Sequence, residues 1–139
     1  MIEQFSEDSN FLLSDFPSYQ KWITQVITTE GFQVGDINYV FVSDDYLLKI
    51  NQEYLQHNYY TDIITFDYVD EHVISSDILI SIDRVEANAE TFKVAFSEEL
   101  KRVMVHGVLH LCGHADASPA EKTDMRNLEE HYMAMFAQS

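Results

Sequence analysis

Basic residues are scarce in this sequence. Its 139 residues include eight Lys and Arg against 24 Asp and Glu, which gives a formal net charge of −16. Proteins that bind nucleic acids unaided usually present basic patches to the phosphates, and anionic membrane surfaces attract basic segments in the same way. The composition therefore argues against a general DNA- or RNA-binding protein and against docking on an anionic membrane. A bound divalent cation would still supply positive charge locally.

Cysteine, glycine, proline and long apolar runs are also rare or missing. The single cysteine, Cys112, excludes an internal disulfide framework and is compatible with a reducing compartment. Four glycines and two prolines are few for an all-β sandwich with many tight turns. No apolar run approaches the roughly 20 residues of a membrane-spanning helix, and the acidic N-terminus lacks the basic start of a signal peptide. We therefore expect a cytoplasmic protein.

Hydrophobic residues are abundant enough for a substantial core. They make up 46% of the chain, and the length fits one domain spanning residues 1–139. Apolar spacing and capping residues predict strands at 2–8, 37–42, 62–69 and 73–81, and helices at 14–31, 43–54, 83–92, 97–113 and 118–136. Because helices and strands intermix, we expect an α/β or α+β class with a small sheet packed on helices.

Two histidines stand four residues apart inside an apolar helical run. His106 and His110 therefore project from one helix face, about one turn apart along the axis. Two nitrogens in this position can bind one metal ion at roughly 2.0–2.1 Å each, as the paired histidines of zinc hydrolases do. The pair predicts a metal-dependent hydrolase. The alternative of two ordinary helix histidines fits the flanking residues less well.

A third metal ligand has to come from the chain beyond this helix. His114 continues the spacing, but positions eight apart on a straight helix are about 12 Å apart, too far for one ion. The helix can end at Gly113, because glycine adopts the left-handed conformation without a Cβ penalty. After that turn either Asp116 or His114 can complete the site, and the other can orient an imidazole. Three protein ligands leave a position for water, which is the catalytic arrangement.

Residues 106–113, His-Gly-Val-Leu-His-Leu-Cys-Gly, resemble the signature of the YbeY family, bacterial metal-dependent endoribonucleases implicated in ribosomal RNA maturation. The family pattern is His-Gly-x-Leu-His-Leu-x-Gly-Tyr-Asp-His, and blocks at 50–54, 61–66 and 76–80 resemble further family stretches. The resemblance implies a zincin-like α+β domain that binds one zinc ion. It also implies an activity on single-stranded ribosomal RNA precursors, with the ribosome or a ribosomal protein as partner.

Three departures from the family pattern concern the site. The family's third histidine falls on Asp116 and its tyrosine on His114, and Asp is an acceptable zinc ligand at about 2.0–2.2 Å. The expected ligands are therefore His106, His110 and Asp116, with His114 as the alternative to Asp116. The family arginine implicated in catalysis falls on Leu55, where no guanidinium can steady a phosphate. The catalytic residues thus stay unassigned.

Two other functions remain open at this point. Leu55 in place of arginine is compatible with a ribosome assembly or binding factor whose zinc is structural. A small zinc metallopeptidase is disfavoured, because His-Glu-x-x-His enzymes carry their general base directly after the first histidine and Gly107 stands there. The aromatic segment 55–60 offers Tyr59 or Tyr60 for stacking on a base. Given the net charge, we expect docking on RNA to depend on the ribosome or a protein partner.

Overall fold

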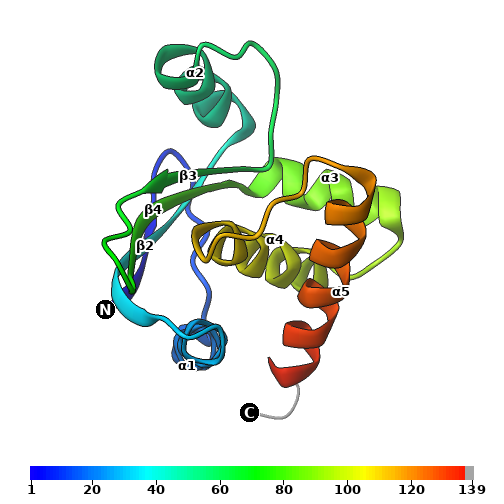
Figure 1. The fold of residues 1–139 in the computed structure, drawn as a ribbon. Helices are drawn as coiled ribbons and strands as arrows, with labels where there is room; N and C mark the ends of the chain where they lie inside the picture. The colour runs from blue at the N-terminus through cyan, green and yellow to red at the C-terminus, as the bar shows by residue number, and fades with distance from the viewer. Residues whose placement is uncertain (137–139) are drawn as a thin grey trace.

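A four-stranded mixed sheet forms the frame of this protein, whose computed structural model describes residues 1–136 (Figure 1). The strands are β1 (Ile2–Ser6), β2 (Gln33–Val42), β3 (Ile63–Asp67) and β4 (Val73–Ser81), in the order β1-β2-β4-β3. β1, β2 and β4 are parallel, whereas β3 pairs antiparallel with β4 and lies at an edge. The sheet confirms the expected α+β class.

The described part of the chain also contains five helices. They are α1 (Phe16–Thr29), α2 (Asp44–Leu55), α3 (Ile82–Phe92), α4 (Phe96–Leu111) and α5 (Pro119–Phe136). Alternate side chains of β2 serve the two faces: Tyr39 and Phe41 join the large core with α1, α4 and α5, while Val42 packs with Leu47 of α2. None of these helices is long and apolar enough to cross a bilayer.

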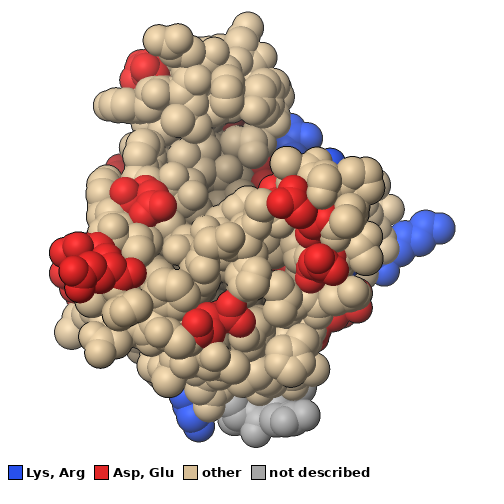
Figure 2. All heavy atoms as spheres, in the orientation of Figure 1, with Lys and Arg blue, Asp and Glu red and all other residues tan. Residues whose placement is uncertain are grey.

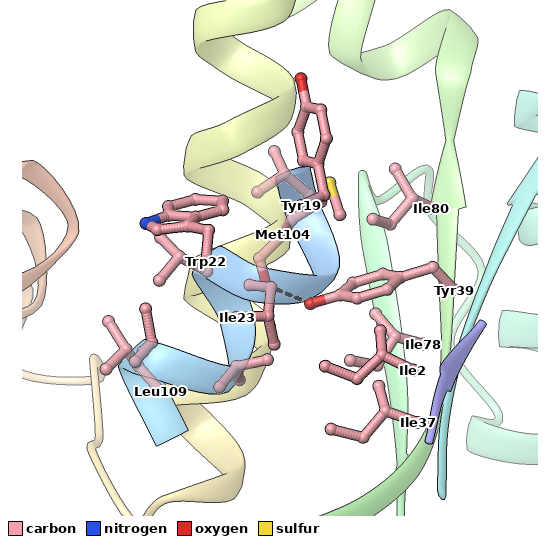
Figure 3. Packing of buried hydrophobic residues seen from close by; sticks show 14 of the residues in the cluster. Ile2, Tyr19, Trp22, Ile23, Ile37, Tyr39, Ile78, Ile80, Met104 and Leu109 are labelled. Carbon is pink, nitrogen blue, oxygen red and sulfur yellow. Dashed lines mark hydrogen bonds between the residues drawn. The ribbon is translucent and has the colours of Figure 1, made fainter. Parts of the chain in front are cut away.

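Helix α4 buries more side chains than any other of these helices. Its buried side chains are Leu100, Val103, Met104, Val105, Val108, Leu109 and Leu111. The hydroxyl of Tyr39 donates a hydrogen bond to the carbonyl oxygen of Met104 at 3.1 Å (Figure 3). At Gly107 an added Cβ would come within 2.8 Å of Ile63 Cδ1 and 3.3 Å of Thr65 Cγ2. The missing side chain therefore lets α4 lie directly against β3.

The start of β2 differs from the sequence prediction. The strand begins at Gln33 rather than at residue 37, because residues 33–34 also pair with β4, on the far side of a register shift. Gly35 lies within this irregularity. A Cβ at Gly35 would approach the carbonyl oxygen of Ile74 to 2.9 Å, so glycine permits the close approach of the two strands.

Two helix starts also differ from the prediction. The N-cap of α3 is Ser81, whose Oγ accepts a hydrogen bond from the backbone N–H of Arg84 at 3.1 Å, and Asp83 lies inside the first turn. Helix α4 begins after Ala95, so Ser97 is a first-turn residue rather than the cap. In both cases the helix starts earlier than the most obvious capping residue suggested, by two residues or fewer, which is the usual uncertainty of such boundaries.

Removal of the Tyr39 hydroxyl tests how much this hydrogen bond contributes to holding α4. Tyr39 is fully buried, and burial raises the pKa of its hydroxyl so far that it stays a neutral donor. We expect Tyr39→Phe to lower the free energy of unfolding by about 1 kcal/mol in urea denaturation followed by circular dichroism. The control Tyr68→Phe, at an exposed position, should change it by less than about 0.5 kcal/mol. Equal losses in both variants would contradict this expectation.

Candidate metal centre

His106 and His110 lie on one face of α4, as the four-residue spacing predicts. Their ring centroids are 4.6 Å apart with an interplanar angle of 81°. The side chains are 23% and 35% exposed, so both imidazoles are reachable from solvent while the opposite face of the helix packs in the core. The firmly held helix therefore presents two nitrogen donors at a fixed separation.

Asp116 reaches both imidazoles because the chain reverses after α4. The helix ends at Leu111, and Gly113 adopts a φ of +100°, in the left-handed region that favours glycine. Asp116 Oδ2 lies 3.5 Å from His106 Nε2, and Oδ1 lies 3.4 Å from His110 Nε2. Two atoms bound tetrahedrally at about 2.1 Å to one ion are about 3.4 Å apart. The spacing therefore fits one cation held by two imidazoles and a carboxylate.

Among the described residues, these three form the one group of His, Cys, Asp or Glu side chains that could hold a metal ion. One ligand atom from each of His106, His110 and Asp116 lies within 4.8 Å of the others. Cys112 is not part of the group, and burial raises the pKa of its thiol to about 12. This thiol therefore stays protonated and packs as a small apolar side chain.

His114 lies outside this cluster and holds the reversed chain in place. Its Nε2 donates a hydrogen bond to Glu30 Oε1 at 2.5 Å, and the Tyr132 hydroxyl donates to the other oxygen of Glu30. Burial alone would raise the pKa of Glu30, but the hydrogen bonds from Tyr132 and His114 bring it below its ordinary value. Of the two candidates that the sequence left open, Asp116 is the one that lies beside the two histidines. His114 instead connects the loop to the end of α1 and, through Glu30, to α5.

Glu129 of α5 orients the first histidine. Its Oε2 accepts a hydrogen bond from His106 Nδ1 at 2.7 Å, and its Oε1 accepts one from Arg102 at 3.0 Å. These contacts leave His106 Nε2 as the nitrogen available to a cation. Burial alone would lower the pKa of His106, but the hydrogen bond and charge of Glu129, with the charges of Asp116 and Asp62, raise it. Sequence analysis missed Glu129, which has no local motif.

An open cleft of about 830 Å³ lies in front of the cluster. It runs between α4, β3 and the segment after α2, and Figure 2 shows the surface hollowed below the lobe that α2 forms. Three carboxylates line it, those of Asp62, Asp67 and Asp116, and no Lys or Arg does among the described residues. In Figure 2 the Lys and Arg side chains lie at the margins of the view. The cleft wall itself thus supplies no permanent positive charge.

The segment after α2 forms an ordered aromatic rim on this cleft. Buried Asn51 donates its side-chain N–H to the carbonyl oxygen of Tyr59 at 2.9 Å. The rings of His57 and Tyr59 stack 5.2 Å apart at 20°, and the Tyr59 hydroxyl lies 3.1 Å from His57 Nδ1. Tyr60 does not line the cleft, and its ring lies 5.2 Å from the guanidinium carbon of Arg84. Of the two tyrosines expected to stack on a base, only Tyr59 is placed to do so.

The position of the family arginine is occupied by an apolar side chain. Leu55 lines the cleft. Two other arginines are engaged elsewhere: Arg84 pairs with Asp44 at 2.6 Å, and Arg102 pairs with Glu129 at 3.0 Å. Neither of them lines the cleft.

The fold and the site together define a small α+β metal-dependent hydrolase. A family model described as Endoribonuclease YbeY matches residues 4–137. The chain belongs to this family, which confirms the resemblance seen in its sequence.

Individual relatives match over almost their whole length. The Endoribonuclease YbeY of Flavobacterium psychrophilum is 48% identical over 95% of this chain and 94% of its own. The Parabacteroides distasonis protein of the same name is 45% identical over 96% and 94%. The solution structure of TM1509 from Thermotoga maritima has a TM-score of 0.66 at 25% identity, covering 99% of this chain and 93% of its own. The family fold is thus present over the described chain.

Substitution of each candidate third ligand separates their roles. We expect Asp116→Ala to weaken zinc binding by more than about a hundredfold, because it removes one of three donors, and His114→Ala by about tenfold, because it only loosens the loop. Competition with a chromophoric chelator measures both affinities. Asp67→Ala, which removes another cleft carboxylate, is the matched control and should bind zinc normally. Similar losses for the variants at 114 and 116 would contradict the assignment.

Zinc binding should release a proton near neutral pH. Because the pKa of His106 is raised, its imidazole is partly protonated there and the metal has to displace the proton. The affinity should therefore fall as the pH falls through that raised pKa. Glu129→Gln removes the raising charge, so the fall should move to lower pH. Calorimetry in buffers of different ionisation enthalpy measures the released protons, and an affinity unchanged between about pH 6 and 8 would refute this coupling.

Proposed function

We propose that this chain is a metal-dependent endoribonuclease that cleaves single-stranded precursors of ribosomal RNA, with one zinc ion held by His106, His110 and Asp116. The observation that carries the proposal is the convergence of two imidazoles and one carboxylate beside an open cleft. The relatives that match nearly the whole chain are named for RNA cleavage. Gly107 supports the choice against a peptidase, because it stands where His-Glu-x-x-His enzymes carry their general base.

The chain's own residues prepare the site for phosphodiester hydrolysis. His106 and His110 offer their Nε2 atoms and Asp116 a carboxylate oxygen, and three protein donors leave a tetrahedral position open. Glu129 fixes the ring of His106 through its Nδ1. Zinc, when bound, would polarise a phosphoryl oxygen and lower the pKa of a bound water toward about 7. The negative charge of Asp116 makes this site less positive than one with three histidines.

The aromatic rim of the cleft favours a single-stranded substrate. His57 and Tyr59 form a stacked pair, and Tyr59 is 56% exposed. Bases of an unpaired strand can stack on such rings, whereas bases inside a duplex are already stacked and paired. We therefore assign unpaired RNA segments as the substrate.

The net charge of −16 supports a need for a docking partner. An acidic protein repels free RNA beyond the immediate site, and the cleft adds three carboxylates to that repulsion. Contacts with the ribosome or a ribosomal protein would supply the affinity that charge does not. A protein that matures ribosomal RNA would work in the cytoplasm.

Removal and return of the metal tests the proposal. We expect a chelator to abolish cleavage of a fluorescent single-stranded fragment of a ribosomal RNA precursor, and zinc to restore it. His110→Ala should lower the initial rate by about a hundredfold or more without changing the circular dichroism spectrum. His72→Ala, in the exposed turn between β3 and β4, is the matched control and should cleave normally.

Two outcomes would overturn the proposed activity. Cleavage at an unchanged rate after chelation would show that the metal cluster takes no part in it. Unfolding of the chelated protein and of His110→Ala, with no cleavage by the zinc-loaded wild type, would instead support a binding factor with a structural zinc.

A further inference from the structure

Two basic side chains of α5 lie beside the metal cluster. A second depression, of about 310 Å³, adjoins the cleft. Its lining comprises His106, Asp116 and five residues of α5, namely Lys122, Thr123, Met125, Arg126 and Glu129. It shares His106 and Asp116 with the cleft. Lys122 and Arg126 are both exposed. An RNA strand that passes the metal cluster on this side would therefore lie near two cationic side chains.

These two cations are not neutralised by ion pairs. The chain has only eight Lys and Arg. Arg84 and Arg102 are each committed to a carboxylate, and Lys101 lies 4.1 Å from the centre of an aromatic ring. Among the residues that the structure describes, neither Lys122 nor Arg126 has a carboxylate oxygen within 4.0 Å. In so acidic a protein, two unpaired cations beside the cluster are available for an anionic ligand.

The packing of α5 fixes the direction in which they point. Lys122 and Arg126 are four residues apart, hence on one face and about 6 Å apart along the axis. Met125 and Glu129 of the same helix are buried, and Glu129 is hydrogen-bonded to His106. The rotation of α5 about its axis is therefore set by a contact with the metal cluster itself.

We infer that Lys122 and Arg126 form a phosphate-binding subsite for the RNA strand on the α5 side of the metal cluster. This inference rests on the proposed function. The cleft wall carries carboxylates and, at Leu55, an apolar side chain where the family has arginine. The strand's bases would meet the His57–Tyr59 rim on one side of the cluster, and its backbone phosphates would meet α5 on the other. The positive charge missing from the cleft is thus supplied by the neighbouring helix.

A pair of matched double variants tests the subsite. Lys122→Ala/Arg126→Ala removes both cations, and Lys21→Ala/Lys49→Ala removes the same charge from exposed positions on α1 and α2 that line neither depression. Zinc-loaded proteins are mixed with a short, fluorescein-labelled single-stranded RNA. Binding is measured by anisotropy at several salt concentrations, and KM and kcat come from initial cleavage rates.

The α5 variant should bind the RNA about tenfold more weakly, with a raised KM and a kcat within about twofold of the wild type. Its plot of log affinity against log salt should be shallower by about 1.4, because each phosphate contact on a single strand contributes about 0.7. The control pair should keep the wild-type values. The charge-conserving exchange Lys122→Arg/Arg126→Lys should restore binding.

The subsite is overturned if the α5 variant keeps the wild-type affinity and salt dependence, or if it behaves like the control pair. It is also overturned if the charge-conserving exchange fails to restore binding, or if the zinc-loaded wild type does not bind the RNA at all. A wild type that binds without cleaving, together with an α5 variant that loses binding, would uphold the subsite and refute the proposed nuclease activity.

Discussion

The reversal of the chain after α4 is the constraint on which the rest of the structure depends. A straight helix can offer one ion only two donors one turn apart, here His106 and His110, because the next position on that face is too far away. Gly113, with its φ of +100°, ends the helical path and sends Asp116 back to both rings. The resulting site has an open side, which is what separates a hydrolytic metal centre from a closed structural one.

Long-range contacts hold this local geometry, and they connect it to the core. Glu30, the C-cap residue of α1, accepts hydrogen bonds from His114 in the loop and from Tyr132 on α5. The backbone carbonyl of Tyr132 in turn accepts a hydrogen bond at 2.6 Å from the indole N–H of Trp22, which is fully buried. A disturbance of the packing between α1 and α5 would therefore move the loop that carries Asp116. We expect fold stability and metal affinity to be coupled through these contacts.

Sequence patterns predicted the parts of the site that depend on local spacing. The four-residue spacing of the histidines on α4 predicted the pair, and Gly113 beyond them limited the third ligand to two candidates. Apolar alternation predicted four strands. The pattern could not decide between Asp116 and His114, because the deciding partner, Glu30, is 84 residues away from His114. Glu129 and the rim position of His57 were missed for the same reason: their roles arise from tertiary packing.

An anomalous-scattering map at the zinc edge, from crystals soaked in zinc, tests the central claim most directly. The account predicts one strong peak within about 2.0–2.2 Å of His106 Nε2, His110 Nε2 and an oxygen of Asp116, with His114 still bound to Glu30. An empty position between the two imidazoles, or a peak bound by His114 in place of Asp116, would contradict it.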